Sequence, residues 1–159
     1  MANWPERETW EAMKAGDACE MCEDIHLPEN QHSFLVADLD ITYVRLPRNQ
    51  YKRGWTILAL KRHASELFEL FELTAEELSG FWGEVSAVAE VLNQIHSPAK
   101  MNYMVFGNRC PHIHCHLIPV TFEDDPNQPI HMLEKEVFLA DAEYQETIHQ
   151  MRRLINGEK

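Results

Sequence analysis

Apolar residues recur in five short stretches of the chain, and several of these stretches alternate apolar and polar positions. Alternation with a period of two is typical of β-strands that bury one face. Between the first two stretches lies Asp38-Leu39-Asp40, which predicts a hairpin turn. The predicted strands cover residues 33–37, 41–46, 55–60, 101–106 and 112–120.

Helical spacing of apolar residues occurs in four other stretches, over residues 4–15, 66–73, 74–96 and 141–155. The longest of them opens with Thr74 and Glu77, which have the spacing of a capping box and therefore predict where this helix begins. Strands and helices in this order predict an antiparallel sheet backed by helices, the α+β fold class.

The chain has the length of one ordinary domain, with 159 residues. Its 14 basic and 26 acidic residues give a net charge of −12, which disfavours a nucleic acid or an anionic membrane as partner. No apolar stretch approaches the roughly 20 residues of a membrane span. The first residues carry acids and a proline where a signal peptide has an apolar run, so we expect a cytoplasmic protein.

Acidic residues are absent from two long windows, residues 41–65 and 91–122. The first window also carries six Lys and Arg residues, and the second carries Lys100 and Arg109. Such segments in an acidic protein can serve a site for an anionic substrate. They can also arise because strands contain few acids. Composition alone leaves both explanations open.

Three of the nine histidines lie within five residues, as His112, His114 and His116. On a strand, side chains at alternate positions share a face, so we expect the three rings on one face of the sheet. Imidazole can bind a metal, or it can attack phosphorus as a nucleophile. A purely structural histidine ladder is the third interpretation.

A second motif is Cys19-Glu-Met-Cys22, in a stretch that resembles a turn. Two cysteines at this spacing can bind zinc, form a redox pair, or occur by chance. No βαβ unit of the thioredoxin type surrounds them, and a zinc site needs two further ligands from elsewhere. Cys110 is one competitor for that role. Cys115 is another, although alternation places it away from the triad as a small buried residue.

The histidine stretch resembles the signature of the histidine triad (HIT) family, in which three histidines alternate with apolar residues. Residues 112–118 match it, with Cys115 the least typical apolar position. Gly107-Asn108-Arg109-Cys110-Pro111 is similar to the Gly-Asn-x-x-Pro lead-in of bacterial members, and residues 58–63 resemble a family strand that ends in a basic pair and a histidine. The resemblance covers about residues 17–155.

This resemblance implies a HIT-like sheet of about five strands, with an N-terminal zinc knuckle and a C-terminal helix. It implies a single domain over residues 1–159, with its core at about 17–122 and the helix at about 138–156. It also implies a homodimer. In zinc-bearing relatives, the ligands at the matching positions are Cys19, Cys22, His63 and His112. Four protein ligands close a zinc site, so this metal would be structural. The resemblance gives no organic cofactor.

The resemblance further implies a nucleotide hydrolase or transferase that works through a covalent nucleotidyl-histidine. His114 would attack the α-phosphorus, His116 would contact the phosphate, and His112 would hold the constellation in place. Asn108 and Arg109 are candidates to bind the nucleotide, or are simply turn residues. Where one branch has an acid that binds ribose, this chain has Leu46-Pro-Arg-Asn-Gln50, in which Asn49 is the candidate substitute.

Three alternatives remain beside this assignment. A dinucleoside polyphosphate phosphorylase would differ only in using phosphate, instead of water, to resolve the intermediate. A regulatory module would bind nucleotides and turn them over slowly. A metalloenzyme would use the three triad histidines to bind a catalytic zinc.

Overall fold

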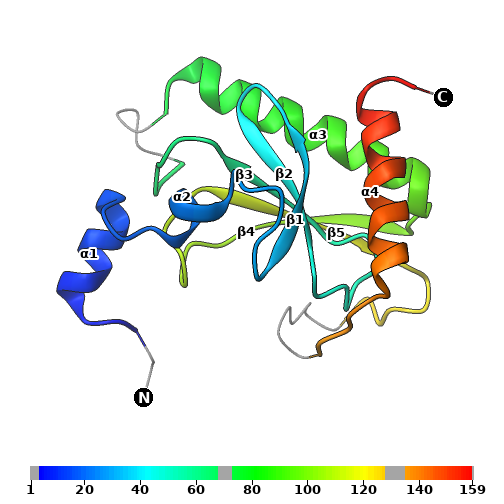
Figure 1. Cartoon of the computed structure of the whole chain (residues 1–159), viewed down its shortest axis with the longest axis horizontal. Helices are drawn as coiled ribbons and strands as arrows, with labels where there is room; N and C mark the ends of the chain where they lie inside the picture. The colour runs from blue at the N-terminus through cyan, green and yellow to red at the C-terminus, as the bar shows by residue number, and fades with distance from the viewer. Residues whose placement is uncertain (1–3, 68–72, 128–134, 159) are drawn as a thin grey trace.

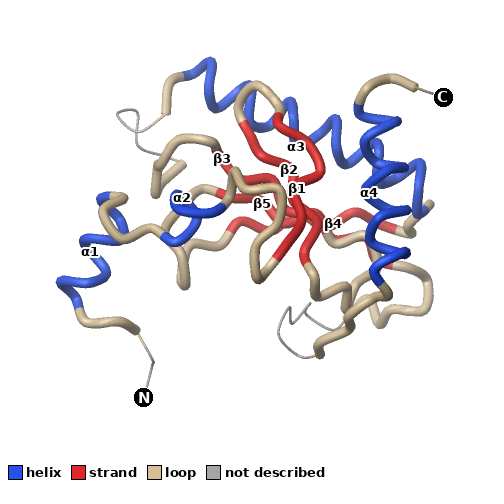
Figure 2. The backbone as a smooth tube through the Cα atoms, viewed as in Figure 1, coloured by secondary structure: helices blue, strands red, loops and turns tan. Residues whose placement is uncertain are grey.

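A five-stranded antiparallel sheet in the order β1-β2-β3-β5-β4 forms the centre of the molecule (Figures 1 and 2). The computed structural model describes residues 4–67, 73–127 and 135–158. The strands are β1 (Ser33–Asp38), β2 (Thr42–Pro47), β3 (Thr56–Leu60), β4 (Lys100–Val105) and β5 (His114–Val120). The predicted α+β class and the five-stranded sheet are confirmed.

The described residues also form four helices: α1 (Arg7–Ala15), α2 (Glu20–Asp24), α3 (Ala75–His96) and α4 (Asp141–Ile155). The capping box that opens α3 is present, because Thr74 Oγ1 accepts from the Glu77 backbone N–H and Glu77 accepts from the Thr74 N–H. The helix ends where Ser97 adopts a left-handed conformation, with φ of 44°. The apolar spacing over residues 66–73 falls mostly on 68–72, outside the described residues.

Two local predictions near the N-terminus need correction. The first helix begins at Arg7 instead of residue 4, with Glu6 as the residue before it. The Cys19–Cys22 stretch, predicted as a turn, is the start of α2. Cys19 is the extended residue that precedes this helix, and its carbonyl accepts from the Cys22 N–H at 3.0 Å. A five-residue helix is too short to show a helical period, so the sequence pattern missed it.

The two faces of the sheet have different contents, and strand register sets them. Leu58 in β3 lies opposite Cys115 in β5, and both are fully buried in the core with Phe81 of α3. Cys115 is therefore the small buried residue that alternation predicted. The next register pair is Ile57 and His116, whose side chains must point to the other face. The sheet thus separates an apolar core under α3 from a face that carries histidine.

The C-terminal helix is tied to the edge of the sheet by Arg152. The guanidinium donates to the carbonyls of Leu35 and Val36, both at 2.8 Å, where a bulge between Leu35 and Ala37 disturbs the ladder of β1. Arg152 lies in the last turn of α4, where a cation also complements the helix dipole. A disturbed ladder leaves strand carbonyls free to accept from a side chain, and the arginine uses them.

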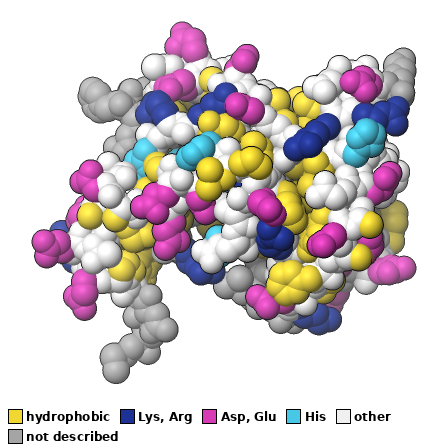
Figure 3. Space-filling model, viewed as in Figure 1, with side chains coloured by type: hydrophobic (Ala, Val, Ile, Leu, Met, Phe, Trp, Pro, Cys, Tyr) yellow, Lys and Arg dark blue, Asp and Glu magenta, His cyan; other side chains and the backbone are white. Residues whose placement is uncertain are grey.

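Charged side chains are dispersed on the face shown in Figure 3, where Asp and Glu are interleaved with Lys and Arg. The net charge of −12 is therefore not gathered into one patch on that face. Among the described residues, no helix combines the length and the apolar character that crossing a membrane requires.

Candidate active site and metal centre

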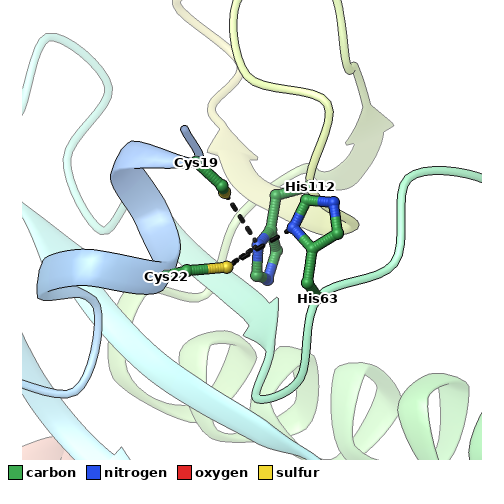
Figure 4. Close-up of side chains that lie close together, drawn as sticks. All are labelled: Cys19, Cys22, His63 and His112. Carbon is green, nitrogen blue, oxygen red and sulfur yellow. Dashed lines mark hydrogen bonds between the residues drawn. The ribbon is translucent and has the colours of Figure 1, made fainter. Parts of the chain in front are cut away.

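Cys19, Cys22, His63 and His112 come together from three separate parts of the chain (Figure 4). The cysteines lie at the start of α2, His63 follows β3, and His112 lies two residues before the start of β5. One potential ligand atom from each residue lies within 4.8 Å of all the others. The family resemblance predicted these four residues as the ligands, and the fold places them side by side.

The spacing of these ligand atoms fits a tetrahedral zinc ion. Cys19 Sγ lies 3.4 Å from His112 Nδ1, and Cys22 Sγ lies 3.4 Å from His63 Nδ1 and 3.5 Å from His112 Nδ1. Zinc bonds of about 2.3 Å to sulfur and 2.0–2.1 Å to nitrogen, at tetrahedral angles, separate a sulfur from a nitrogen by roughly 3.5 Å. The group therefore has the chemistry and the size of a closed structural site.

Both metal-site histidines are oriented by backbone carbonyls. His63 Nε2 lies 2.8 Å from the Lys14 carbonyl, and His112 Nε2 lies 2.7 Å from the Leu60 carbonyl. A carbonyl can only accept, so in each ring Nε2 carries the proton and Nδ1 keeps its lone pair. Hydrogen bonds of this kind, made by the ring nitrogen that does not bind the metal, fix the orientation of a metal-binding histidine. Lys14 belongs to α1, so this helix takes part in positioning the site.

Burial favours the neutral forms of Cys22 and His112 when no cation is bound. It raises the pKa of the Cys22 thiol to about 12, with a further contribution from the neighbouring Cys19. It also lowers the pKa of His112 to about 4. A bound dication reverses the preference of the thiols, because thiolate is the form that coordinates zinc. Cys110 lies beside the group, with its Sγ 3.9 Å from Cys19 Sγ.

The three triad histidines do not share one strand face, contrary to prediction. The strand β5 begins at His114. His112 lies before it in a tight turn, in which the His112 N–H donates to the Cys110 carbonyl at 2.8 Å. The His112 ring faces the metal group, 5.3 Å from the His63 ring centroid. His114 and His116 do share a face, with ring centroids 5.0 Å apart. Because the His112 N–H is used within this turn, it is not available to a sheet ladder, which explains the late start of the strand.

His114 is held in one tautomer by the backbone of His112. His114 Nδ1 lies 2.5 Å from the His112 carbonyl, so it donates its proton there and leaves a lone pair on Nε2. The side chain is 7% exposed, and burial lowers its pKa, which favours the neutral ring. A neutral imidazole with a free Nε2 is a nucleophile. His112 thus takes part in both sites. Its ring belongs to the metal group, and its backbone carbonyl accepts from His114 Nδ1.

His116 is surrounded by aromatic rings that sequence reasoning did not assign to the site. The indole Nε1 of Trp55 lies 3.1 Å from His116 Nδ1, and the Phe106 ring centroid is 6.5 Å from that of His116. Burial, followed by the proximity of His114, lowers the pKa of His116 to about 3. Only the pairing of β3 with β5, which the sequence does not reveal, brings Trp55 to His116.

The other predicted nucleotide contacts lie on the connection between β4 and β5. Asn108 and Arg109 are both exposed there, so their nucleotide-binding role stays a prediction. Asn49, the candidate replacement for the ribose-binding acid, has its amide occupied. It donates to the Lys135 carbonyl at 2.9 Å and accepts from the Val137 N–H at 3.0 Å.

Basic side chains of the acid-free window 41–65 bind protein groups. Arg45 is buried and donates to the carbonyls of Ile25 and Leu27, which ties the segment after α2 to β2. The other five form ion pairs with acids from other segments: Arg48–Glu29, Lys52–Asp124, Arg53–Glu143, Lys61–Asp38 and Arg62–Glu77. These cations are thus paired with groups of the protein itself. A substrate-related role for the windows stays a prediction.

Fold and site together define an α+β protein with two neighbouring histidines on a central strand and a Cys2His2 group at its start. Residues 29–123, more than half of the chain, match the family model described as HIT domain, and the chain belongs to the HIT family. Cys19 and Cys22 lie before the matched region. No curated protein sequence matches the chain.

Solved structures with the same fold include a histidine triad protein from Bradyrhizobium japonicum, with a TM-score of 0.69, 22% identity, and 79% of this chain and 92% of that chain covered. A zinc-bound histidine triad family protein from Mycobacterium smegmatis has a TM-score of 0.61 and 16% identity, covering 89% and 95%. A diadenosine triphosphate hydrolase from Plasmodium falciparum has a TM-score of 0.56 and 12% identity, covering 77% and 76%.

Proposed function

We propose that this protein is a nucleotide hydrolase or transferase that cleaves a nucleoside phosphoanhydride or phosphoramidate, such as a dinucleoside polyphosphate. The observation that carries the proposal is the His114 ring, whose Nδ1–H is bound by the His112 carbonyl so that Nε2 is free to attack. Membership of the HIT family supports it. A protein of similar fold is named as a diadenosine triphosphate hydrolase, which indicates a suitable substrate class.

In the proposed reaction, His114 Nε2 forms a bond to the α-phosphorus while the bond from phosphorus to the leaving group breaks. The leaving group takes up a proton as it departs. Water then attacks the same phosphorus, the phosphorus–nitrogen bond breaks, and His114 is regenerated with the nucleoside monophosphate as product. Splitting one displacement into two easier steps is the usual advantage of a covalent route. Use of phosphate instead of water makes the same site a phosphorylase.

His116 is the proposed donor to the transferred phosphate, with Asn108 and Arg109 as further contacts. We expect His116→Ala to lower kcat by about 10²–10³, since that is the usual cost of losing one donor to developing negative charge. The effect should be smaller than that of His114→Ala, because the nucleophile remains. Steady-state kinetics on both variants test the ranking. Equal and complete losses at the two positions would contradict it.

The experiment that tests the function is incubation of the purified protein with nucleoside polyphosphates, dinucleoside polyphosphates and phosphoramidates, followed by mass spectrometry of the products. We expect release of a nucleoside monophosphate from at least one class. Parallel reactions with isotopically labelled phosphate separate the hydrolase from the phosphorylase, because only the latter incorporates the label into a nucleoside diphosphate. Nucleotide binding without turnover of any compound would support a regulatory module instead.

We further propose that zinc occupies the Cys2His2 group and is structural. The group already contains four protein ligands, so no position is left for a reacting water. His114 and His116 are not members of it, which speaks against the alternative in which the three triad histidines hold a catalytic metal. A cytoplasmic location and the extent of the domain, residues 1–159, stay predictions.

A homodimer is the proposed assembly, and β4 is the surface that supports it. This strand lies at the edge of the sheet, and Tyr103, Val105 and Phe106 are 49%, 38% and 44% exposed there. Exposed edge strands with apolar side chains readily pair with another strand. We expect Val105→Lys to shift a wild-type dimer towards monomer in sedimentation velocity. Phe122→Ser, at a 96% exposed loop position, is the control, and a monomeric wild type would contradict the proposal.

A further inference from the structure

The contact between Trp55 and His116 joins two buried side chains of neighbouring strands. Trp55 is 7% exposed and His116 is 6% exposed, and 3.1 Å separates the indole Nε1 from His116 Nδ1. Register explains how they meet. His116 lies directly opposite Ile57, and Trp55 is two residues before Ile57, so all three side chains point to the same face. The ring centroids of Trp55 and His116 are 5.6 Å apart.

The backbone around Trp55 is braced by a buried side chain, which fixes where the indole points. Gln50 is 3% exposed, donates to the Trp55 carbonyl at 3.0 Å and accepts from the Gly54 N–H at 3.0 Å. Gly54 has φ of 83°, a conformation that favours glycine, so the turn before β3 depends on this residue. The Trp55 N–H also donates to the Lys52 carbonyl at 3.0 Å. This indole is therefore part of a rigid turn.

An indole N–H can donate but never accept a hydrogen bond. The nitrogen that faces it in His116 must therefore be the acceptor, and in a neutral ring the proton then resides on Nε2. His114 has the opposite arrangement, with its proton on Nδ1 and its lone pair on Nε2. Two adjacent rings thus present a lone pair and a proton, respectively. Nucleophilic attack on phosphorus with stabilisation of its oxygens needs this pair of functions.

We propose that Trp55 is a positioning residue that holds His116 in the Nε2–H tautomer and so supplies the site with a fixed proton donor beside the nucleophile. The catalytic use of this donor rests on the proposed function of the site. The tautomer of His116 does not depend on that function, because it follows from the contact with the indole N–H alone. The alternative is that Trp55 only fills space, in which case removing its N–H changes neither the tautomer nor the rate.

The test combines imidazole NMR with kinetics on the zinc-loaded full chain near neutral pH. In long-range ¹H–¹⁵N correlation spectra, we expect His116 of the wild type to show a protonated Nε2 and an unprotonated Nδ1. Trp55→Phe keeps an aromatic ring but loses the donor, so His116 should become a mixture of tautomers. Incorporation of 3-benzothienylalanine at position 55 keeps the indole shape without the N–H and should do the same. Trp82→Phe, at an exposed position of α3, is the matched control.

For a nucleotide that the wild type turns over, we expect both position-55 variants to lower kcat by about 3- to 10-fold, the value of one neutral hydrogen bond. KM should stay near the wild-type value, because the donor acts in the transition state. A wild-type His116 with its proton on Nδ1, or variants with unchanged tautomer and kcat, would overturn the inference. If the wild type turns over no nucleotide, the proposed function fails while the NMR result still decides the tautomer.

Discussion

His114→Ala is expected to reduce turnover by at least about 10⁴-fold while nucleotide binding and zinc content stay near wild-type values. Loss of a covalent nucleophile removes the reaction route itself, and effects of this size follow when a nucleophile is deleted. The fold should tolerate the change because the His114 ring donates a hydrogen bond to the backbone carbonyl of His112 and otherwise packs beside His116. Steady-state rates and equilibrium titration with a non-hydrolysable nucleotide measure the two properties separately.

A matched control for this variant is His149→Ala, which removes an exposed histidine of α4. We expect its rate to equal that of the wild type. A His114→Ala protein that keeps even a tenth of the wild-type rate would exclude the covalent mechanism. Loss of binding along with the rate would instead assign His114 a binding role.

Cys19→Ser is expected to abolish stoichiometric zinc and to lower the melting temperature by roughly 5–10 °C. Cys19 is 1% exposed, and its Sγ lies against His112 Nδ1 in the proposed zinc site. Losing one of four ligands should weaken zinc binding by more than about 100-fold. Removing a residue that only hydrogen-bonds to a ligand already lowers metal affinity by about 10- to 100-fold. Metal-binding energy at such a site is folding energy, and 1 kcal/mol shifts the melting temperature of a domain this size by about 2–4 °C.

Cys110→Ser is the control, because this thiol lies beside the group but outside the four ligands. It should keep one zinc per chain. In Cys19→Ser, activity per folded molecule should fall only as far as the unanchored His112 lets its carbonyl move from His114 Nδ1. Elemental analysis that finds no zinc in wild-type protein purified without chelator would refute the metal assignment.

Patterning predicted the sheet and the two long helices because these elements extend over several periods of the sequence. The capping box at Thr74 is an example in which local chemistry alone marks the boundary. Short or irregular elements were not predicted, because they do not extend over several periods of the sequence. The helix after Cys19 is one turn long, and His112 left the strand because Cys110 and Pro111 form a turn before it.

The four residues of the metal group could be predicted from the motif resemblance. The backbone carbonyls that orient its two histidines could not. The carbonyls of Lys14 and Leu60 orient His63 and His112, and any residue type can supply a carbonyl. Trp55 escaped for a related reason. Its donor meets His116 only because β3 pairs with β5 in one particular register, and register between distant strands is a tertiary property.

The most direct test of the account is intact-mass analysis of the protein after rapid mixing with a dinucleoside polyphosphate. The quench is alkaline, because a phosphorus–nitrogen bond to imidazole is acid-labile. We predict that the wild type gains the mass of one nucleoside monophosphate group, that peptide mapping places it on His114, and that His114→Ala gains nothing. Product release without any such adduct at the shortest mixing times, or an adduct mapped to another residue, would contradict the covalent mechanism.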